Sequence, residues 1–471
     1  MTDCAPAHAQ TLGPMKQSLI QARARVGAVL RDGALRRVFA NALRLMSGNA
    51  LQALLGMFAV FLAARGLKVE RFGQLVLVSS WSLIVLQLFS FQSSHALVKE
   101  GAVSAARDNF AALWGVMRVG LLLDVATATL AAFVFVAGTA VTSQFVALDP
   151  VVIVLAYAYA LSMITTIVAS PTSLLRLFDR YDAFVLHGTV TGLSKLIFTA
   201  VAWALGGGLL YFGIAWIAAQ VVSNIVLCGL AAREFRRQMR MHPLRAPIPK
   251  TREVMRMFPE LRSRLISTNL SATLRMVRDL DVPLLGWLLN PAAVGLFKIA
   301  RQIGSGLNKL IDPIFQAIYP DMAAIEERAG SRAVAQLLRR SSVIIGSCGL
   351  AALAVFVVIG RPVIELGLGP DFLASFPAAV SCVIGAAVWG FSQSYGAALL
   401  VWNRHRALLA LNVVSSAIYL ASVFVLARAW GVTGAGLATA IYFVGWSIAA
   451  VLLARHEIRL RNLSNQPAPS A

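Results

Sequence analysis

Charged side chains recur at helical spacing in two neighbouring segments that are otherwise apolar enough to enter a lipid bilayer. Drawn as helices, the second segment places six polar side chains within an arc of about 100°, and the first places seven within about 120°. The six are Lys298, Arg301, Ser305, Asn308, Lys309 and Asp312. The seven are Arg264, Ser267, Thr268, Ser271, Arg275, Arg278 and Asp279. Each helix is therefore predicted to carry a cationic stripe.

Charges inside a membrane need partners. An unpaired charge that faces lipid at the bilayer centre costs at least ~2.5 kcal/mol, so the two stripes are expected to face each other or water. The cations are Arg275, Arg278, Lys298, Arg301 and Lys309, and they outnumber the acids Asp279, Asp281 and Asp312. This excess predicts a wet cavity that receives an anionic ligand. The alternative is that arginines and aspartates pair among themselves and hold the helices together.

Composition places the whole chain in a membrane. Of its 471 residues 58% are hydrophobic and 13% charged, which is typical of a polytopic membrane protein. The net charge of +21 follows from basic residues beside membrane spans, so no nucleic acid partner is predicted. The four cysteines lie far apart, which predicts neither a disulfide framework nor a metal site.

Twelve apolar segments are long enough to cross the membrane. They lie at about 45–64, 74–97, 111–138, 151–177, 188–206, 209–231, 264–288, 292–319, 342–360, 376–400, 407–429 and 432–454. The predicted fold is all-α, with about twelve transmembrane helices in two six-helix lobes, at 41–232 and 264–455. A basic segment at 1–40 precedes them, a basic, proline-containing linker at 233–263 joins them, and a tail at 456–471 follows.

The two predicted lobes repeat short stretches of sequence at a fixed offset. The stretch at 66–75 corresponds to 288–297 at an offset of 222, and Glu234 corresponds to Glu457 at an offset of 223. An even number of spans in each lobe makes the repeat parallel. Repeats of this kind are typical of transporters whose substrate site lies between the halves.

Several short motifs carry a resemblance to a known family. They are Glu70-Arg71-Phe72-Gly73, 95–101 (HALVKEG), 290–297 (NPAAVGLF), 368–372 (LGPDF) and 431–438 (GVTGAGLA). In their order and spacing the chain resembles the oligosaccharide flippases of the multidrug/oligosaccharidyl-lipid/polysaccharide (MOP) exporter superfamily over about residues 40–455. Lys68 is a departure, because the family often has glycine there. The resemblance implies two six-helix lobes in a V around a cationic lumen, and undecaprenyl-diphosphate-linked glycan as the ligand.

A diphosphate ligand assigns roles to the cations of the stripe. Arginine presents a planar fork that suits phosphate oxygens. The predicted diphosphate contacts are Arg275, Arg278 and Arg301. Lys298 and Lys309 are expected to attract the ligand over a longer range, and Arg264 is expected at the cytoplasmic mouth.

Acidic groups within the spans are candidates for coupling transport to protons or sodium ions. They are Asp124, Asp279, Asp281 and Asp312. No cofactor is predicted beyond such an ion, and no metal. The facing wall of the first lobe has only scattered candidates, which are Arg44, His95, Glu100, Arg118, Asp124 and Lys195. Three of these, Arg44, Glu100 and Lys195, are predicted near cytoplasmic span ends, where snorkelling accounts for the charge.

The predicted function is translocation of lipid-linked oligosaccharide units across the bacterial inner membrane for exopolysaccharide, lipopolysaccharide O-antigen or capsule synthesis, without enzymatic activity. Membrane lipids, a polysaccharide polymerase and chain-length proteins are the expected partners. One alternative is a membrane polysaccharide polymerase or ligase, but such an enzyme is expected to have a long external loop. A second is an exporter of drugs or organic cations, which would favour an acidic lumen.

Orientation follows from the positive-inside rule. Most of the 42 Lys and Arg fall in the tails, the linker and the even-numbered loops, which places both termini and the linker in the cytoplasm. A reporter enzyme that works only in the periplasm should therefore be inactive when it is fused after Ala246. Activity of that fusion would contradict the twelve-span topology.

Overall fold

The computed structural model describes residues 33–90, 93–145, 148–244, 247–261 and 277–464. It describes the backbone but not the side chains of residues 33–50, 95, 277, most of 310–333 and 462–464. Arg264 and Arg275 therefore lie outside the described residues, and so do the side chains of Arg44, His95 and Asp312.

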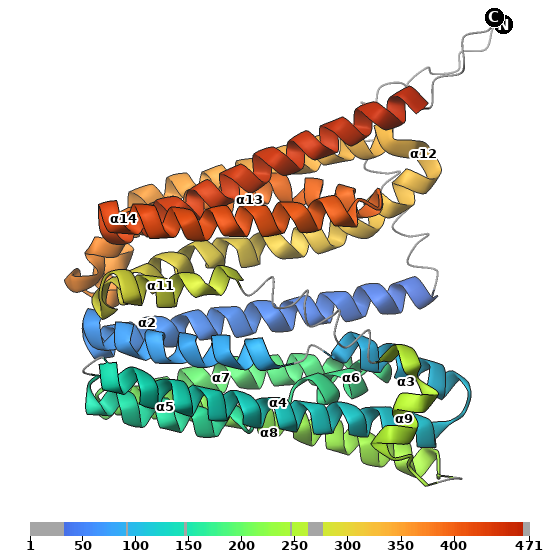
Figure 1. Ribbon diagram of the computed structural model, residues 1–471. Coiled ribbons are helices and arrows are strands. Elements are labelled where there is room, and N and C mark those ends of the chain that lie inside the picture. The colour runs from blue at the N-terminus through green and yellow to red at the C-terminus, as the bar shows by residue number, and fades with distance from the viewer. Residues whose placement is uncertain (1–32, 91–92, 146–147, 245–246, 262–276, 465–471) are drawn as a thin grey trace, which may run out of the picture.

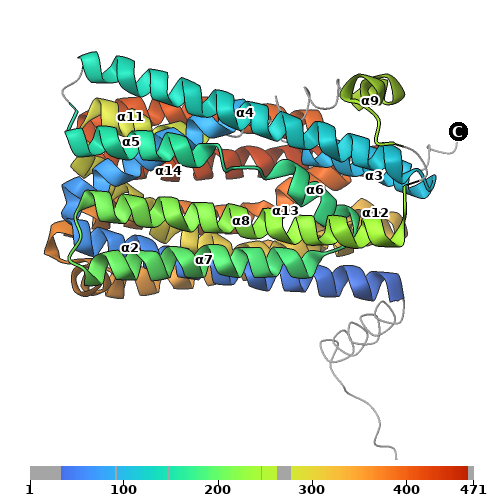
Figure 2. The ribbon, with the colours of Figure 1, turned by 90° about the horizontal axis from the view of Figure 1, so that it is seen from below.

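Within the described ranges every regular element is a helix. The first group, here called the N-lobe, comprises α2 (Gly33–Phe89), α3 (Ser94–Ala106), α4 (Phe110–Phe145), α5 (Pro150–Met163), α6 (Ala169–Leu177), α7 (Tyr181–Ala204), α8 (Leu209–Met241) and α9 (Thr251–Met257). The second group, the C-lobe, comprises η1 (Val277–Leu280), α11 (Asp281–Leu288), α12 (Pro291–Leu368), η2 (Pro370–Ser375), α13 (Phe376–Val401) and α14 (His405–Ser464). The two groups lie side by side with their long axes roughly aligned (Figures 1 and 2).

The predicted class, an all-α multi-pass membrane protein, is confirmed. Seven helices of the described residues are long and apolar enough to cross a membrane. Three helices each extend over two predicted spans: α12, α2 with a break at Lys68, and α14 with a break at Trp430 and Gly431. Large apolar side chains such as Phe133 and Val358 are exposed, as lipid-facing side chains are. The domain boundaries read from the sequence stay predictions.

Three predicted spans are not continuous helices. The span at 74–97 ends with α2 at Phe89 and resumes as α3, and the span at 151–177 is interrupted between α5 and α6. In the seventh span, η1 leads into α11, and Pro283 lies in the first turn of α11. Proline is tolerated there because the first turn needs no N–H from it. The helix type thus changes just before Pro283, from the 3-10 turn η1 to α11.

The two lobes meet through glycine at one end of the bundle, where the outer loops are predicted. Gly73 of α2 and Gly295 of α12 are equivalent at the offset of 222, and their backbones lie against each other. A methyl group on Gly295 would come 2.6 Å from the carbonyl oxygen of Val69, and one on Gly73 would overlap the carbonyl of Pro291. Only glycine permits so close a backbone approach. Just before this contact, Lys68 has φ 60°, a conformation that favours glycine.

At the opposite end each lobe is braced internally by an arginine and a glutamate. Arg180 pairs with Glu234 in the N-lobe, and Arg404 pairs with Glu457 at 2.8 Å in the C-lobe. Both glutamates are buried, and the two pairs are equivalent in the repeat. The residue before each arginine, Asp179 or Asn403, has a positive φ, so the repeated turn is the same in both lobes.

The glycine contact gives a testable expectation. Gly73→Ala should force α2 and α12 apart, because its new methyl group meets backbone rather than a flexible side chain. We expect a lower unfolding temperature of the detergent-purified protein. Gly138→Ala is the matched control, since nothing lies within 4 Å of the methyl group it adds. Equal unfolding temperatures for the two variants would show that the glycine contact is not needed.

Candidate functional site

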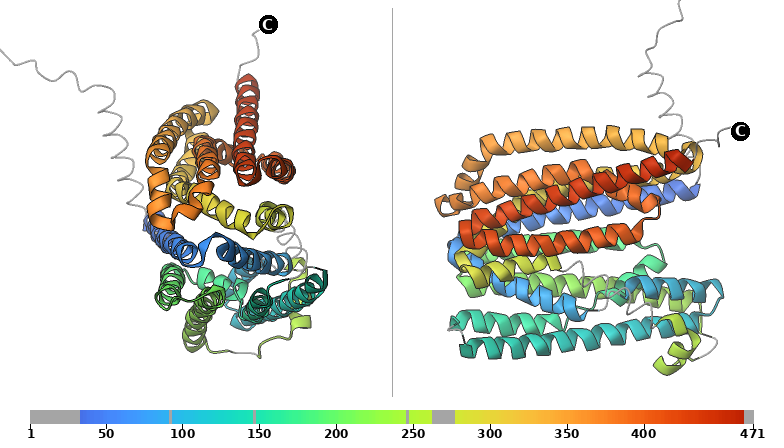
Figure 3. Two further views of the ribbon diagram at one scale, coloured as in Figure 1. Left: turned by 90° about the vertical axis from the view of Figure 1, so that its left-hand side faces the viewer. Right: turned by 45° about the horizontal axis from the view of Figure 1, so that its top comes forward.

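A cavity of about 760 Å³ lies between helices of the two lobes. Its lining comes from α2, α5, α7 and α8 of the N-lobe and from α12 of the C-lobe. The end-on view in Figure 3 shows α2 lying between the remaining N-lobe helices and the C-lobe. Gly192 lets α7 pack closely on α2, because a methyl group there would come 3.0 Å from the Cα of Gln52.

Three lysines line this cavity. Lys298 and Lys309 come from α12, and Lys195 comes from α7 on the opposite wall. The lining contains no aspartate or glutamate among the described residues. The ammonium of Lys195 lies 4.0 Å from the ring centroid of Trp216, a cation–π contact that holds this lysine in place. The cavity can therefore attract an anion.

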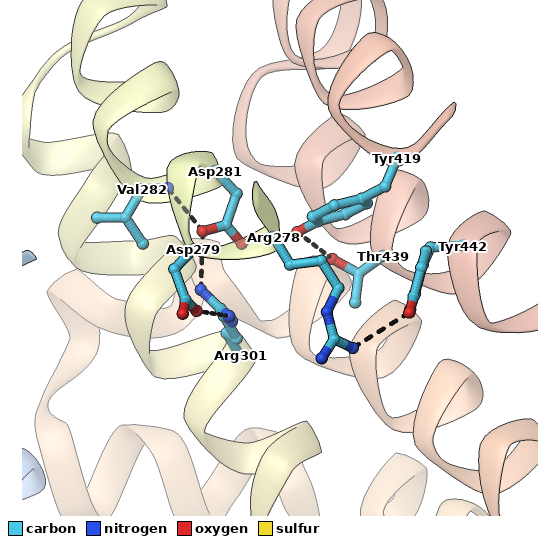
Figure 4. Close-up of polar contacts among 8 residues, drawn as sticks. All are labelled: Arg278, Asp279, Asp281, Val282, Arg301, Tyr419, Thr439 and Tyr442. Carbon is cyan, nitrogen blue, oxygen red and sulfur yellow. Dashed lines mark hydrogen bonds and ion pairs between the residues drawn. The ribbon is translucent and has the colours of Figure 1, made fainter. Parts of the chain in front are cut away.

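A second pocket of about 220 Å³ lies within the C-lobe and contains the arginines. Arg301 donates to Asp281 at 2.7 Å and to Asp279 at 2.9 Å (Figure 4). Asp281 is fully buried, and its other oxygen accepts a hydrogen bond of 2.7 Å from the Tyr419 hydroxyl. This cluster joins α11, α12 and α14 by charge-assisted hydrogen bonds.

Arg278 completes the second pocket with a neutral partner. Its guanidinium donates to the Tyr442 hydroxyl at 3.1 Å and lies 5.6 Å from the centroid of that ring. Figure 4 shows Arg278 and Arg301 on separate partners, one on α14 and the other on the two aspartates. Among the hydrogen bonds that the structure describes, Arg278 therefore has no carboxylate partner.

The predicted stripe is therefore divided between two pockets. Lys298 and Lys309 face the large cavity, whereas Arg301 and Arg278 line the small one. The diphosphate contacts assigned to the arginines stay predictions. Lys195, predicted near a cytoplasmic span end, also lines the large cavity.

The aspartates predicted for ion coupling have structural partners where their side chains are described. Asp124 of α4 accepts a hydrogen bond of 2.8 Å from the backbone N–H of Ser170, at the start of α6. It thereby satisfies a backbone group freed by the interruption of the fourth span. Among the described residues no three His, Cys, Asp or Glu side chains come together as metal ligands would. Ion coupling through Asp124, Asp279, Asp281 and Asp312 stays a prediction.

The N-lobe wall contains residues that the sequence did not single out. Tyr159, Trp216, Gln52 and Gln220 all line the large cavity. In the sequence they are single aromatic or amide residues within apolar spans, which is also the pattern of ordinary helix packing. Only the convergence of α2, α5 and α8 on the cavity distinguishes them.

Solved structures share this fold. One is an inward-facing multidrug resistance MATE family transporter of the MOP superfamily, with a TM-score of 0.69 at 13% identity over 90% of this chain and 100% of that one. Another is the lipid II flippase MurJ in an inward closed conformation, with a TM-score of 0.63 at 11% identity over 90% and 93%. The protein thus has the fold of the MOP exporters.

Sequence comparison is more specific. The chain matches the family described as "Polysaccharide biosynthesis protein" over residues 38–326, and it belongs to that family. It is also 26% identical to the inner membrane protein YghQ of Escherichia coli (strain K12), over 73% of this chain and 96% of that protein. The family resemblance read from the sequence is confirmed.

The Arg301 cluster leads to a prediction about stability. Arg301→Gln should cost roughly 3 kcal/mol because it leaves the Asp281 carboxylate buried without its cation. Adding Asp281→Asn should recover much of that loss in unfolding temperature and in membrane level. Arg278→Gln is the matched control and should cost about 1 kcal/mol, since its partner is a neutral hydroxyl.

Two results would contradict this structural role of Arg301. A double variant no more stable than Arg301→Gln alone would contradict it. An Arg301→Lys variant that folds normally but loses diphosphate binding would instead support the ligand contact predicted from the sequence.

Proposed function

We propose that the protein is a flippase that moves undecaprenyl-diphosphate-linked oligosaccharide units across the bacterial inner membrane for surface polysaccharide synthesis. The observation that carries this proposal is the large cavity between the lobes, which is lined by three lysines and, among described residues, by no acid. Membership of the polysaccharide biosynthesis family supports a glycan as the cargo. The finished polymer would be exopolysaccharide, lipopolysaccharide O-antigen or capsule.

The electrostatic attraction between the cavity lysines and a diphosphate is large enough to support binding. A phosphate charge about 4 Å from an ammonium gains roughly 4 kcal/mol at an effective dielectric of about 20, before desolvation. Lys298 and Lys309 are 11 residues apart on α12, which is about 16 Å along the helix axis. In the predicted orientation Lys309 is nearer the cytoplasm. The diphosphate would bind there first and then pass toward Lys298 and Lys195.

Alternating access would follow from rocking of the two lobes. The contact of Gly73 with Gly295 would close the outer end in the present state, and its separation would open the cavity to that side. Because the contact involves backbone and no interlocking side chains at these two positions, it can part without breaking an ion pair.

Other readings are less well supported. An exporter of organic cations would need acids in the cavity, and the described lining has none. The similar structures are transporters, so an enzyme acting on the same carrier is disfavoured. We also propose that transport is coupled to protons or sodium ions, and that the protein contacts a polymerase, chain-length proteins and membrane lipids.

Neutralising the cavity lysines tests the proposal. Lys298→Gln and Lys309→Gln should each weaken binding of farnesyl diphosphate, a short analogue of the carrier, by about tenfold, and glycan export in cells should fall with it. Lys99→Gln is the matched control, because Lys99 is exposed on α3 and does not line the cavity. Unchanged binding in both cavity variants would refute the proposed role of the cavity.

A further inference from the structure

Two buried hydrogen-bond donors on the N-lobe wall lack a partner. Tyr159 of α5 and Trp216 of α8 line the large cavity, and their side chains are only 8% and 7% exposed. Neither the Tyr159 hydroxyl nor the Trp216 indole N–H has a hydrogen-bond partner among the described residues. Buried polar atoms in native proteins are nearly always paired. Because both residues line the cavity, a ligand bound there can supply the missing acceptors.

Acceptors lie on the same wall. The hydroxyls of Ser79 and Ser82 donate to the carbonyls of Val76 and Ser79 at 3.0 Å and 2.9 Å, and Ser162 donates to the carbonyl of Tyr159 at 2.7 Å. Each hydroxyl proton is thus already engaged within its own helix. What these serines can offer to the cavity is the lone pairs of their oxygens.

The wall offers both hydrogen-bond donors and acceptors, which suits a ligand with hydroxyl groups. A sugar hydroxyl both donates and accepts, so it matches a wall that offers donors beside acceptors. A phosphate only accepts, and it matches the lysines instead. We propose that Tyr159, Trp216 and Ser162 form a subsite for the sugar unit next to the diphosphate, so that this wall helps to select the glycan. The inference rests on the proposed flippase function.

Lys195 connects the two parts of the cavity. Its ammonium lies over the ring of Trp216, so one face of the indole is occupied by a cation while its N–H lacks a partner. A phosphate bound to Lys195 would bring the attached sugar close to Trp216. The order of groups along the wall would then match the order of groups in the carrier, from diphosphate to first sugar.

Binding measurements separate sugar from phosphate recognition. The probes are farnesyl diphosphate and its conjugates with glucose, galactose and N-acetylglucosamine, measured by calorimetry on detergent-purified protein. Wild type should bind at least one conjugate more tightly than farnesyl diphosphate. Tyr159→Phe should weaken binding of that conjugate by about tenfold and leave farnesyl diphosphate within about twofold.

Matched variants complete the test. Trp216→Phe keeps the ring and removes the N–H, so it should behave like Tyr159→Phe. Tyr157→Phe is the control, because Tyr157 is on the same helix but 41% exposed. Unfolding temperatures verify that each variant is folded, and a failure of Trp216→Phe to fold leaves Tyr159→Phe as the deciding variant.

The outcomes distinguish this subsite from the flippase proposal. The subsite is refuted if wild type prefers none of the conjugates, or if Tyr159→Phe changes conjugates and farnesyl diphosphate equally or changes neither. The flippase proposal itself fails if wild type does not bind farnesyl diphosphate, or if Lys298→Gln and Lys309→Gln both leave that binding intact. Loss of conjugate preference in Tyr159→Phe, with farnesyl diphosphate binding retained, supports both.

Discussion

A carboxylate that is fully buried in a membrane protein needs a cation beside it, and Asp281 is the group on which the C-lobe depends. Its two oxygens receive the guanidinium of Arg301 and the hydroxyl of Tyr419, from α12 and α14. Because Asp281 begins α11, its charge also lies at the positive end of that helix dipole. One acid thereby connects three helices.

Because Asp281 is paired with Arg301, the arginine and the lysines of α12 have different surroundings. Arginine, with a rigid fork, is held by the two aspartates, whereas the lysines, which are point charges on flexible stems, remain on the cavity wall. A transported anion must be released as well as bound. Flexible lysines suit that requirement better than an arginine already engaged by two carboxylates, and the N-lobe adds Lys195 from the opposite side.

The sequence predicted much of this arrangement and missed parts of it for physical reasons. Helical periodicity predicted a single polar stripe on α12, but an arc of about 100° cannot tell which of two adjacent pockets each residue faces. The partner of Asp281 on α14 is 138 residues away, so no local pattern could reveal it. Lys195 lies 14 residues into α7, about 21 Å from its start. The predicted span at 188–206 starts seven residues after α7 does, so the position of Lys195 along the helix could not be read from the sequence.

Lobes that rock must be rigid within themselves and weakly attached to each other. Every ion pair among the described side chains lies within one lobe, including the two equivalent pairs of Arg180 with Glu234 and Arg404 with Glu457. Between the lobes Gly73 lies backbone to backbone on Gly295, and the surrounding contact is apolar, as where the ring of Phe72 packs on that of Phe372. The exposed Arg65 also donates to the carbonyl oxygen of Leu366 across this end at 3.1 Å. Parting the lobes there breaks this apolar contact and the Arg65 hydrogen bond, but it breaks no ion pair that the structure describes. The ion pairs therefore hold each lobe together, while the apolar contact between the lobes can open and close without breaking a described ion pair.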